Sequence, residues 1–250
     1  MAKSTRPKAA KAAAAKPRKK AARPASPATP VTEQDIRARL LQSALRQVPF
    51  EGWSHASLMA AATECGVSLA EAMEAFPAGA PDLLDAYAAW ADESMAHAFE
   101  KTKNLAKLKL GERVALAVRL RLEALAPHRE AERLALNFLA LPPHPFLGLR
   151  LINRTVNAIW RAVGDESVDF SYYTKRLSLA GIYAATHLYW LRDSSDDHDA
   201  TWRFLDQRLQ NLASFTRLRR KAGQTVRDKA MFAADRLRQR ARRGSAGFGV

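Results

Sequence analysis

The side chains that could do acid–base or metal chemistry are scattered along this sequence rather than grouped. Its histidines are His55, His97, His128, His144, His187 and His198. None follows a glutamate by three residues, the spacing found in the paired Glu-x-x-His ligands of di-iron bundles. The sequence also has no Gly-x-Ser-x-Gly elbow, P-loop or dinucleotide-binding glycine motif. We therefore expect no catalysis, no metal and no cofactor, and we expect His187 to be a buried histidine bonded to a neighbour.

The elements that would position these side chains are predicted to be helices throughout. Ala and Leu dominate the 250 residues, and no alternating strand pattern persists. The most apolar stretch, residues 177–191, makes about 22 Å of helix, which is too short to cross a bilayer. A helix that is apolar on nearly every side is expected to be buried in a helical bundle. The turn Asp193–Asp196 after it offers caps for a following helix.

The charge of the chain is concentrated at its two ends. The formal net charge is +15, yet residues 1–30 carry nine Lys or Arg and no acid, and residues 217–243 are also strongly basic. The body between them therefore carries a small excess of acid. The first 31 residues are rich in Lys, Ala and Pro, which predicts a disordered basic tail. This tail could attract polyanions, aid solubility or serve as a mitochondrial transit peptide.

A helix-turn-helix unit is predicted near the start of the ordered chain. A helix from about Thr32 to Val48 should be broken by Pro49, and residues 54–77 then follow as two short helices. The spacing resembles the helix-turn-helix of TetR-type regulators, with Gly66 in the turn and Phe76 closing the second helix. Residues 68–75 contain Glu71 and Glu74 but no Lys, Arg, Asn or Gln. Such a helix lacks donors for base edges and phosphates, so DNA binding is not expected, although the basic tail leaves it open.

Residues 164–209 carry a longer resemblance. The pairs and runs Gly164-Asp165, Asp169-Phe170, Tyr173-Thr174, Arg176, Asp193-Ser194-Ser195 and Thr201–Leu205 resemble the ubiquinone-biosynthesis accessory family called, in words, coenzyme Q protein nine. Weaker similarity extends over roughly residues 33–215. The resemblance implies a TetR-like fold that does not act on DNA, binds isoprenoid lipid or phospholipid, and presents quinone intermediates to the demethoxyubiquinone hydroxylase. It also implies pairing into a homodimer through the late helices.

The resemblance also implies where the sites lie. Arg176 would lie near a lipid head group. Some of the apolar residues at helical spacing would line the lipid pocket, although such residues can also be plain core; they are Ile152, Val156, Trp160, Leu177, Leu179, Ile182 and Tyr183. The guanidinium of Arg176 suits phosphate, although it could instead form a salt bridge with Asp169 or Glu166. The partner-binding patch would comprise Asp169, Phe170, Tyr172 and Tyr173. Many mitochondrial members have Trp at the position of Tyr172, which retains an aromatic ring here but changes the contact.

The last predicted helix, about residues 224–243, is basic and amphipathic. Such helices lie on anionic membrane surfaces, with charge dominating here because the apolar stripe is mostly Ala. The alternative is a solvated terminal helix. The membrane-binding candidates are Arg227, Lys229, Met231, Phe232, Arg236 and Leu237.

Taken together, the sequence predicts an all-α, TetR-like bundle in four parts. These are a basic tail (1–31), a helix-turn-helix unit (32–77), a lipid-binding bundle (78–218) and a basic C-terminal helix (219–250). The expected function is that of a membrane-associated accessory protein of ubiquinone biosynthesis. Its expected place is the cytoplasmic side of a bacterial inner membrane, or else the matrix side of the mitochondrial inner membrane. The alternatives are a TetR-type regulator with an apolar ligand and a lipid-surface protein without a quinone role.

Overall fold

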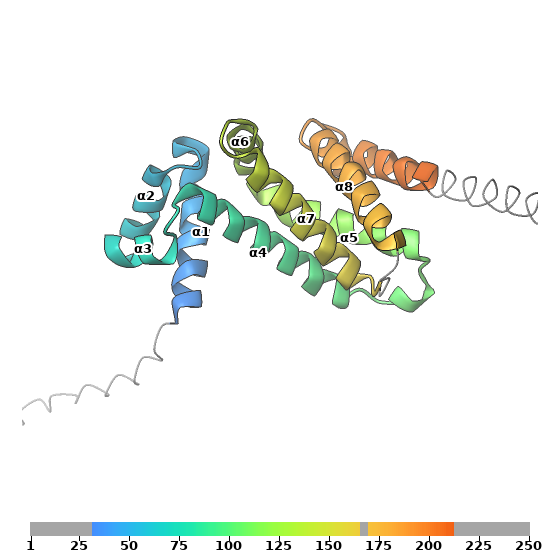
Figure 1. Ribbon diagram of the computed structural model, residues 1–250, viewed down its shortest axis with the longest axis horizontal. Helices are drawn as coiled ribbons and strands as arrows, with labels where there is room; N and C mark the ends of the chain where they lie inside the picture. The colour runs from blue at the N-terminus through green and yellow to red at the C-terminus, as the bar shows by residue number, and fades with distance from the viewer. Residues whose placement is uncertain (1–31, 166–169, 213–250) are drawn as a thin grey trace, which may run out of the picture. The chain divides into compact units, whose positions relative to one another are not determined.

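The computed structural model describes residues 32–165 and 170–212, and the regular structure in these ranges is entirely helical (Figure 1). The all-α prediction is therefore confirmed. The predicted basic tail and C-terminal helix lie outside the described residues. The α-helices run α1 Glu33–Glu51, α2 His55–Cys65, α3 Leu69–Ala75, α4 Ala80–Glu100, α5 Leu110–Leu125, α6 Arg129–Ala140, α7 Pro145–Ala162 and α8 Phe170–Trp190, followed by a helix over 199–212.

The helix-turn-helix unit forms as its caps predict. The Ser54 hydroxyl accepts from the backbone of Ser57 at the start of α2, and Ser68 accepts from Glu71 at the start of α3. Gly66 between them adopts the left-handed conformation, with φ of 64°, which glycine reaches without a steric penalty. The spacing in this stretch was therefore enough to locate both short helices.

The expected end of the first helix before Pro49 is wrong. Pro49 lies inside α1, and the helix ends only at Glu51; the N–H of Gly52 after it donates to the Val48 carbonyl over 2.8 Å. A proline in a helix removes its own backbone donor, and the surrounding hydrogen bonds can still form. The helix therefore continues for its last turn before glycine, with φ of 66°, redirects the chain.

The later helices build the bundle that positions the candidate site. The long helix α4 packs against both α5 and α7, and α7 packs in turn against α8. The indole N–H of Trp53 donates to the carbonyl of Ala131 over 2.9 Å. This hydrogen bond joins the connection between α1 and α2 to α6. One core runs through these contacts, with Leu40, Leu83, Met95, Leu122 and Ile159 fully buried.

Helix α8 is only half buried, in contrast to the expectation for residues 177–191. Leu179, Tyr183 and Trp190 face the core, whereas Leu177 is 77% exposed and Leu188 is 52% exposed. We overestimated the burial of α8 from the sequence, because an apolar side chain is buried only where a neighbouring helix covers it, and the residue type does not show whether one does. Among the described residues, every helix is too short or too polar to span a bilayer.

The turn after α8 is held by one carboxylate. Asp193 Oδ1 accepts from the backbone N–H and the hydroxyl of Ser195, at 2.8 and 2.7 Å. Its Oδ2 accepts from the backbone N–H and the hydroxyl of Thr201, at 2.9 and 2.5 Å. Burial alone would raise the pKa of Asp193, but these four charge-assisted bonds hold it well below its usual range. The turn and caps expected at Asp193–Asp196 are thus present.

Candidate ligand-binding cavity

A cavity of about 1260 Å³ lies among α4, α5, α6, α7, α8 and the turn that follows α8. This is larger than the ~300–1,000 Å³ of ordinary small-molecule pockets. Apolar side chains cover most of its wall: Leu84, Ala88, Ala135, Leu136, Leu139, Ala140, Leu151, Ile152, Ala184, Leu188 and Leu191. A wall of this kind suits an apolar ligand with a chain-like part.

A small group of buried polar residues interrupts the apolar wall. We call it the polar wall; it consists of Tyr87, Arg121, Glu132, Tyr183 and His187. Each of these side chains lines the cavity and at most about a tenth of it is exposed. Buried polar groups are costly unless they are paired, so their partners determine what they could offer a ligand.

Arg121 is the centre of one half of this wall. Its Nε lies 2.7 Å from Asp92 Oδ1, and its Nη1 donates to the hydroxyl of Tyr183. Thr155 donates to the same carboxylate oxygen over 2.9 Å. Burial alone would lower the pKa of Arg121, but Tyr183 and Asp92 raise it above its ordinary value, so the guanidinium stays charged.

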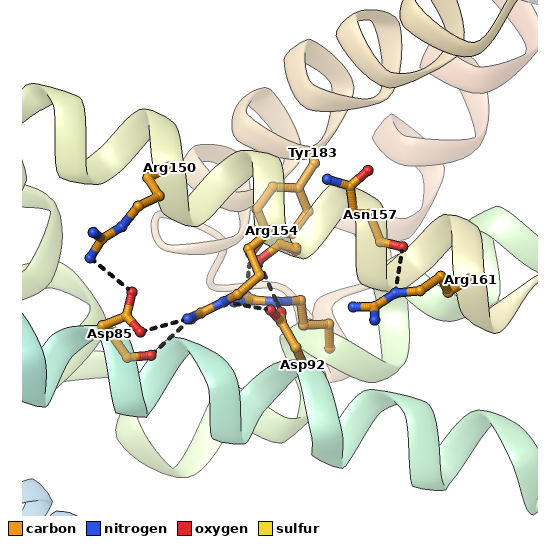
Figure 2. Close-up of polar contacts among 9 residues, drawn as sticks. Asp85, Asp92, Arg150, Arg154, Asn157, Arg161 and Tyr183 are labelled. Carbon is orange, nitrogen blue, oxygen red and sulfur yellow. Dashed lines mark hydrogen bonds and ion pairs between the residues drawn. The ribbon is translucent and has the colours of Figure 1, made fainter. Parts of the chain in front are cut away.

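Two further arginines extend this network toward the surface. Figure 2 shows Arg154 reaching between Asp85 and Asp92, with Arg150 beside Asp85. Arg154 Nη1 lies 2.8 Å from Asp85 Oδ2, and its Nε lies 3.4 Å from Asp92 Oδ2. Arg150 lies 3.1 Å from Asp85 and is mostly exposed. The network therefore joins α4, α5 and α7 behind the cavity.

Glu132 and His187 form the other half of the polar wall. His187 Nε2 lies 3.0 Å from Glu132 Oε2, and both side chains are about nine-tenths buried. Burial tends to raise the pKa of Glu132, but His187, followed by Arg121 and the Tyr87 hydroxyl, lowers it below its ordinary value. Glu132 is thus a buried carboxylate. His187 is buried, as expected, and its Nε2 lies within ion-pair distance of Glu132 without the geometry of a hydrogen bond.

The mouth of the cavity is defined by its exposed lining residues. The lining residues that remain open to solvent are Glu130, Arg133, Asn137, Ala140, Leu188, Arg192 and Ser194. Arg133 pairs with Glu130 over 2.7 Å. Arg129, also in the lining, donates to the carbonyls of Trp190 over 2.7 Å and Asp193 over 2.5 Å. Positive groups therefore outnumber negative ones at this mouth.

A group of exposed apolar side chains, which we call the apolar corner, lies next to the cavity at the connection between α6 and α7. It consists of Leu141, Phe146 and Leu149, which are all strongly exposed; Phe146 is 82% exposed. Residues on either side of the corner, including Leu139, Ala140 and Gly148, line the cavity. The corner thus places three solvent-exposed apolar side chains beside the lining.

The lipid-binding residues expected from the sequence occupy different places in the structure. Ile152 and Tyr183 line the cavity. Val156 and Trp160 lie in the buried core, Ile182 is partly buried and Leu177 is exposed. Arg176 donates from Nε to Asn157 Oδ1 over 2.6 Å, which joins α8 to α7. Their roles in lipid binding stay predictions.

The expected partner-binding and membrane-binding residues are described only in part. Tyr173 is 73% exposed near the start of α8. Asp169 lies outside the described residues, as do the side chains of Phe170 and Tyr172. All six membrane-binding candidates, from Arg227 to Leu237, also lie outside them. These assignments stay predictions.

Sequence reasoning missed Asp92, Arg121 and Glu132. Each lies on a helix face whose neighbours are core residues: Asp92 lies between Ala88 and Met95, and Arg121 lies between Val118 and Leu125. A charged residue at an otherwise apolar position was the available signal, because such residues are buried only when they are paired. Among the described residues, no three His, Cys, Asp or Glu side chains converge as a metal site would require.

The second helix of the helix-turn-helix unit is acidic in the structure as well. Glu71 closes back on Ser68, accepting from its backbone N–H over 2.9 Å and from its hydroxyl over 2.6 Å. Leu69 and Met73 are exposed on the same short helix. The described surface of α3 therefore offers carboxylates and apolar groups.

The architecture is that of a TetR-like all-α protein. A solved structure described as the TetR transcriptional regulator from Nitrosomonas europaea ATCC 19718 matches with a TM-score of 0.57, covering 71% of this chain and 98% of that one. The two chains are 22% identical, so this likeness concerns the fold.

The sequence comparisons are more specific. Residues 147–216 match the COQ9 family model. The chain is 34% identical over 186 residues to the rat (Rattus norvegicus) protein named Ubiquinone biosynthesis protein COQ9, mitochondrial, and 32% identical over 186 residues to the human (Homo sapiens) protein of that name. Each alignment covers 72% of this chain, with 59% of the rat and 58% of the human protein. The chain thus spans less than two thirds of these relatives' length, and over residues 147–216 it carries a COQ9 family domain.

Proposed function

We propose that this protein acts in ubiquinone biosynthesis as a lipid-binding accessory protein without catalysis of its own. It would hold isoprenoid quinone intermediates, or phospholipid, in the cavity and present the quinone intermediate to the demethoxyubiquinone hydroxylase. The role in ubiquinone biosynthesis is supported by the names of the COQ9 relatives and by their identity with this chain. The binding step rests on the cavity.

The single observation that carries the proposal is the size and apolar wall of this cavity. An isoprenoid intermediate is too apolar to travel through water, because each exposed methylene costs about 0.8 kcal/mol. A cavity of about 1260 Å³ lined by leucine, isoleucine and alanine removes that cost for a large part of such a chain. A protein with this cavity could therefore carry an isoprenoid intermediate that an active site exposed to water could not take up by itself.

The apolar corner supports exchange with a membrane. Leu141, Phe146 and Leu149 stand beside the lining and would contact acyl chains, whereas Arg133 and Arg192 at the mouth suit anionic head groups. Tyr173, which is exposed near the start of α8, is proposed to form part of the hydroxylase contact. The basic C-terminal helix would add membrane attachment, on the inner membrane of a bacterium or the matrix side of a mitochondrion.

The decisive experiment is to delete the gene and to measure cellular quinones by mass spectrometry. We expect ubiquinone to fall and a demethoxy intermediate to accumulate, with both restored by the wild-type gene. An unchanged quinone pool would end the proposal. Extraction of lipid from the purified protein would separately test the binding step, and light scattering would test the proposed homodimer.

A TetR-type regulator is the second candidate, and the helix-turn-helix geometry with Gly66 in its turn is what favours it. Against it stands α3, where Glu71 and Glu74 occupy the surface that would face phosphates and base edges. A gel-shift assay with the protein's own promoter region distinguishes the two. We expect no specific shift, and a specific, salt-sensitive complex would bring the regulator forward.

A further inference from the structure

The lysines of the described chain are concentrated in the connection between α4 and α5. Residues 32–212 contain five lysines, and four of them lie within residues 101–109; these four are Lys101, Lys103, Lys107 and Lys109. We call residues 101–109 the lysine loop. All four lysines are exposed, and none is paired with a carboxylate within the described part of the chain, whereas the fifth, Lys175, lies 2.8 Å from Asp165 Oδ1. The loop therefore presents four positive charges to whatever it contacts.

The backbone of the lysine loop is held in place by its own contacts. Arg113 on α5 donates from Nε to the carbonyls of Leu105 and Leu108, at 3.1 and 3.2 Å. The N–H of Leu108 also donates to the carbonyl of Leu105 over 3.1 Å, at the end of a short 3-10 turn. The hydroxyl of Thr102 donates to the carbonyl of Ala98 over 3.0 Å. Because these bonds already order the loop, a surface that binds it does not have to order it first.

Leucines are interspersed with the lysines. Leu105 and Leu108 are half-buried, and Leu110, at the start of α5, is 45% exposed. Residues 101–110 contain no arginine and no aromatic residue. Protein interfaces and nucleic-acid-binding surfaces are usually rich in those two kinds of residue, and lysine is depleted at protein interfaces. Lysine beside exposed leucine is instead typical of a surface that lies on anionic lipid.

The lysine loop lies at the end of the bundle where α7 ends. Helices α4 and α7 lie side by side (Figure 1). Asp85 on α4 lies 3.1 Å from Arg150 on α7. About two turns later on α4, Asp92 accepts from Thr155 over 2.9 Å, so the two helices run in the same direction. The loop that follows α4 is therefore near the last turn of α7, whereas the apolar corner is at its start.

Helix α7 separates the two features by a distance that suits one membrane footprint. Its 18 residues span about 27 Å at 1.5 Å per residue. The helix contains no Asp or Glu. Its exposed residues between the two ends include Arg150, Asn153 and Arg161. A line from the apolar corner to the lysine loop thus follows a helix that carries no acidic residue of its own.

These observations point to an anionic bilayer as the surface that the loop contacts. We propose that the lysine loop is a membrane contact of its own, separate from the apolar corner and from the basic C-terminal residues. Its lysines lie among the lipid phosphates, and Leu110 contacts the layer below them. Together with the apolar corner it sets α7 along the membrane plane, which keeps the cavity mouth at the bilayer. The inference rests on the membrane step of the proposed function and adds the orientation.

The test places an environment-sensitive dye on the loop of the full-length protein. Cys65→Ser removes the single cysteine, and Ala106→Cys then carries the dye among the lysines, at an exposed position. Vesicles of phosphatidylcholine are compared with vesicles of phosphatidylcholine and phosphatidylglycerol. We expect a blue shift of the dye emission with the anionic vesicles only. The control is Ala70→Cys on α3, which is exposed at the other end of α4 and should give no shift.

Two double variants then assign the binding to the lysines. Lys103→Gln with Lys107→Gln should weaken binding to the anionic vesicles about tenfold to thirtyfold, since each lysine near such a surface contributes about 1 kcal/mol. Arg39→Gln with Arg46→Gln is the matched control, because it makes the same change in net charge on exposed residues of α1. At that distance from the loop, salt screens the charges, and affinity should change less than about twofold.

The outcomes separate this inference from the proposed function. If the protein sediments with anionic vesicles while the dye at residue 106 does not respond, the inference is overturned, an acidic protein becomes the favoured partner of the loop, and the membrane step stands. Equal responses to both vesicles, or equal weakening by both double variants, also overturn it. If the protein binds neither vesicle, the membrane step fails as well. The dye measurement keeps all four lysines, so a double variant that does not fold leaves the inference testable.

Discussion

Glu132 on α6 and His187 on α8 lie 3.0 Å apart, measured from Oε2 to Nε2, inside the wall of the cavity. Their contact joins two helices that both border the cavity. A carboxylate buried in this place keeps its charge because His187 and Arg121 lower its pKa. The pair therefore contributes to stability and to the polarity of the cavity at the same time, and the two effects can be measured separately.

The stability effect of Glu132 should depend on pH. Its folded-state pKa lies below its ordinary value, so its contribution is fully present above the unfolded pKa of about 4.3 and is lost as the pH falls through the folded pKa. We expect Glu132→Gln to cost about 2 kcal/mol at pH 7 and progressively less below pH 4. Urea unfolding of wild type and variant at pH 7, 5, 4 and 3 measures the gap. A gap that does not shrink would contradict the assignment.

The buried pair of Asp92 and Arg121 should contribute far more to the free energy of unfolding than a surface pair does. Asp92→Asn leaves Arg121 buried without its countercharge, which should cost about 3–4 kcal/mol of the free energy of unfolding. Glu123→Gln is the control: it breaks the half-exposed pair with Arg119 on the same helix as Arg121 and should cost less than about 0.5 kcal/mol. Denaturant unfolding measures both, and comparable losses would refute the distinction.

Among the residues of the turn after α8, Asp193 should contribute most to the stability of the protein. Asp193→Ala removes the acceptor for four donors on Ser195 and Thr201, and we expect a loss of about 3 kcal/mol. Asp199→Ala, an exposed acid a few residues further on, is a suitable control and should cost under about 1 kcal/mol. Thermal unfolding of both variants gives the comparison. Similar melting temperatures would mean that the turn is held by other contacts.

Two glycines should respond in opposite directions to replacement by alanine. Gly66 has φ of 64°, so Gly66→Ala introduces backbone strain and should cost about 1 kcal/mol although the space around it is open. Gly181 lies within α8 and has open space where the methyl group of an alanine would point, so Gly181→Ala should stabilise the protein by up to about 1 kcal/mol. Thermal unfolding decides the signs. A loss at Gly181 would indicate a close neighbour there.

The apolar corner should affect lipid uptake. Phe146→Asp places a charge beside the cavity lining, and we expect transfer of a fluorescent lipid from anionic vesicles to slow several-fold. Phe50 is 85% exposed and lies on α1, away from the lining, so Phe50→Asp is the matched control and should leave transfer unchanged. Equal slowing by both substitutions would mean that surface charge alone is responsible.

The sequence predicted the helices well because their ends are local features. Ser54, Gly66 and Ser68 mark caps and turns that depend only on nearby residues, and the structure has them where they were expected. Pro49 misled the prediction because one missing donor near a helix end does not stop the helix. Local chemistry was thus a good guide to where helices begin, and a weaker one to where they end.

The cavity could not be derived in the same way. Ile152 and Val156 lie one turn apart on α7 with similar side chains, yet Ile152 lines the cavity and Val156 is buried in the core. The difference depends on whether a neighbouring helix fills the space, and helical periodicity contains no information on that. The same reason explains Leu177, whose apolar side chain is exposed because no helix covers it among the described residues.

The four bonds to Asp193 have a mechanical consequence. They make a stiff joint between α8 and the helix over 199–212, so the two helices should turn together. That second helix is a lever of about 20 Å at 1.5 Å per residue. A tilt of α8 by about 10° to admit a ligand would therefore move its far end by roughly 3 Å. Any tilt of α8 would in this way be transmitted to Leu212.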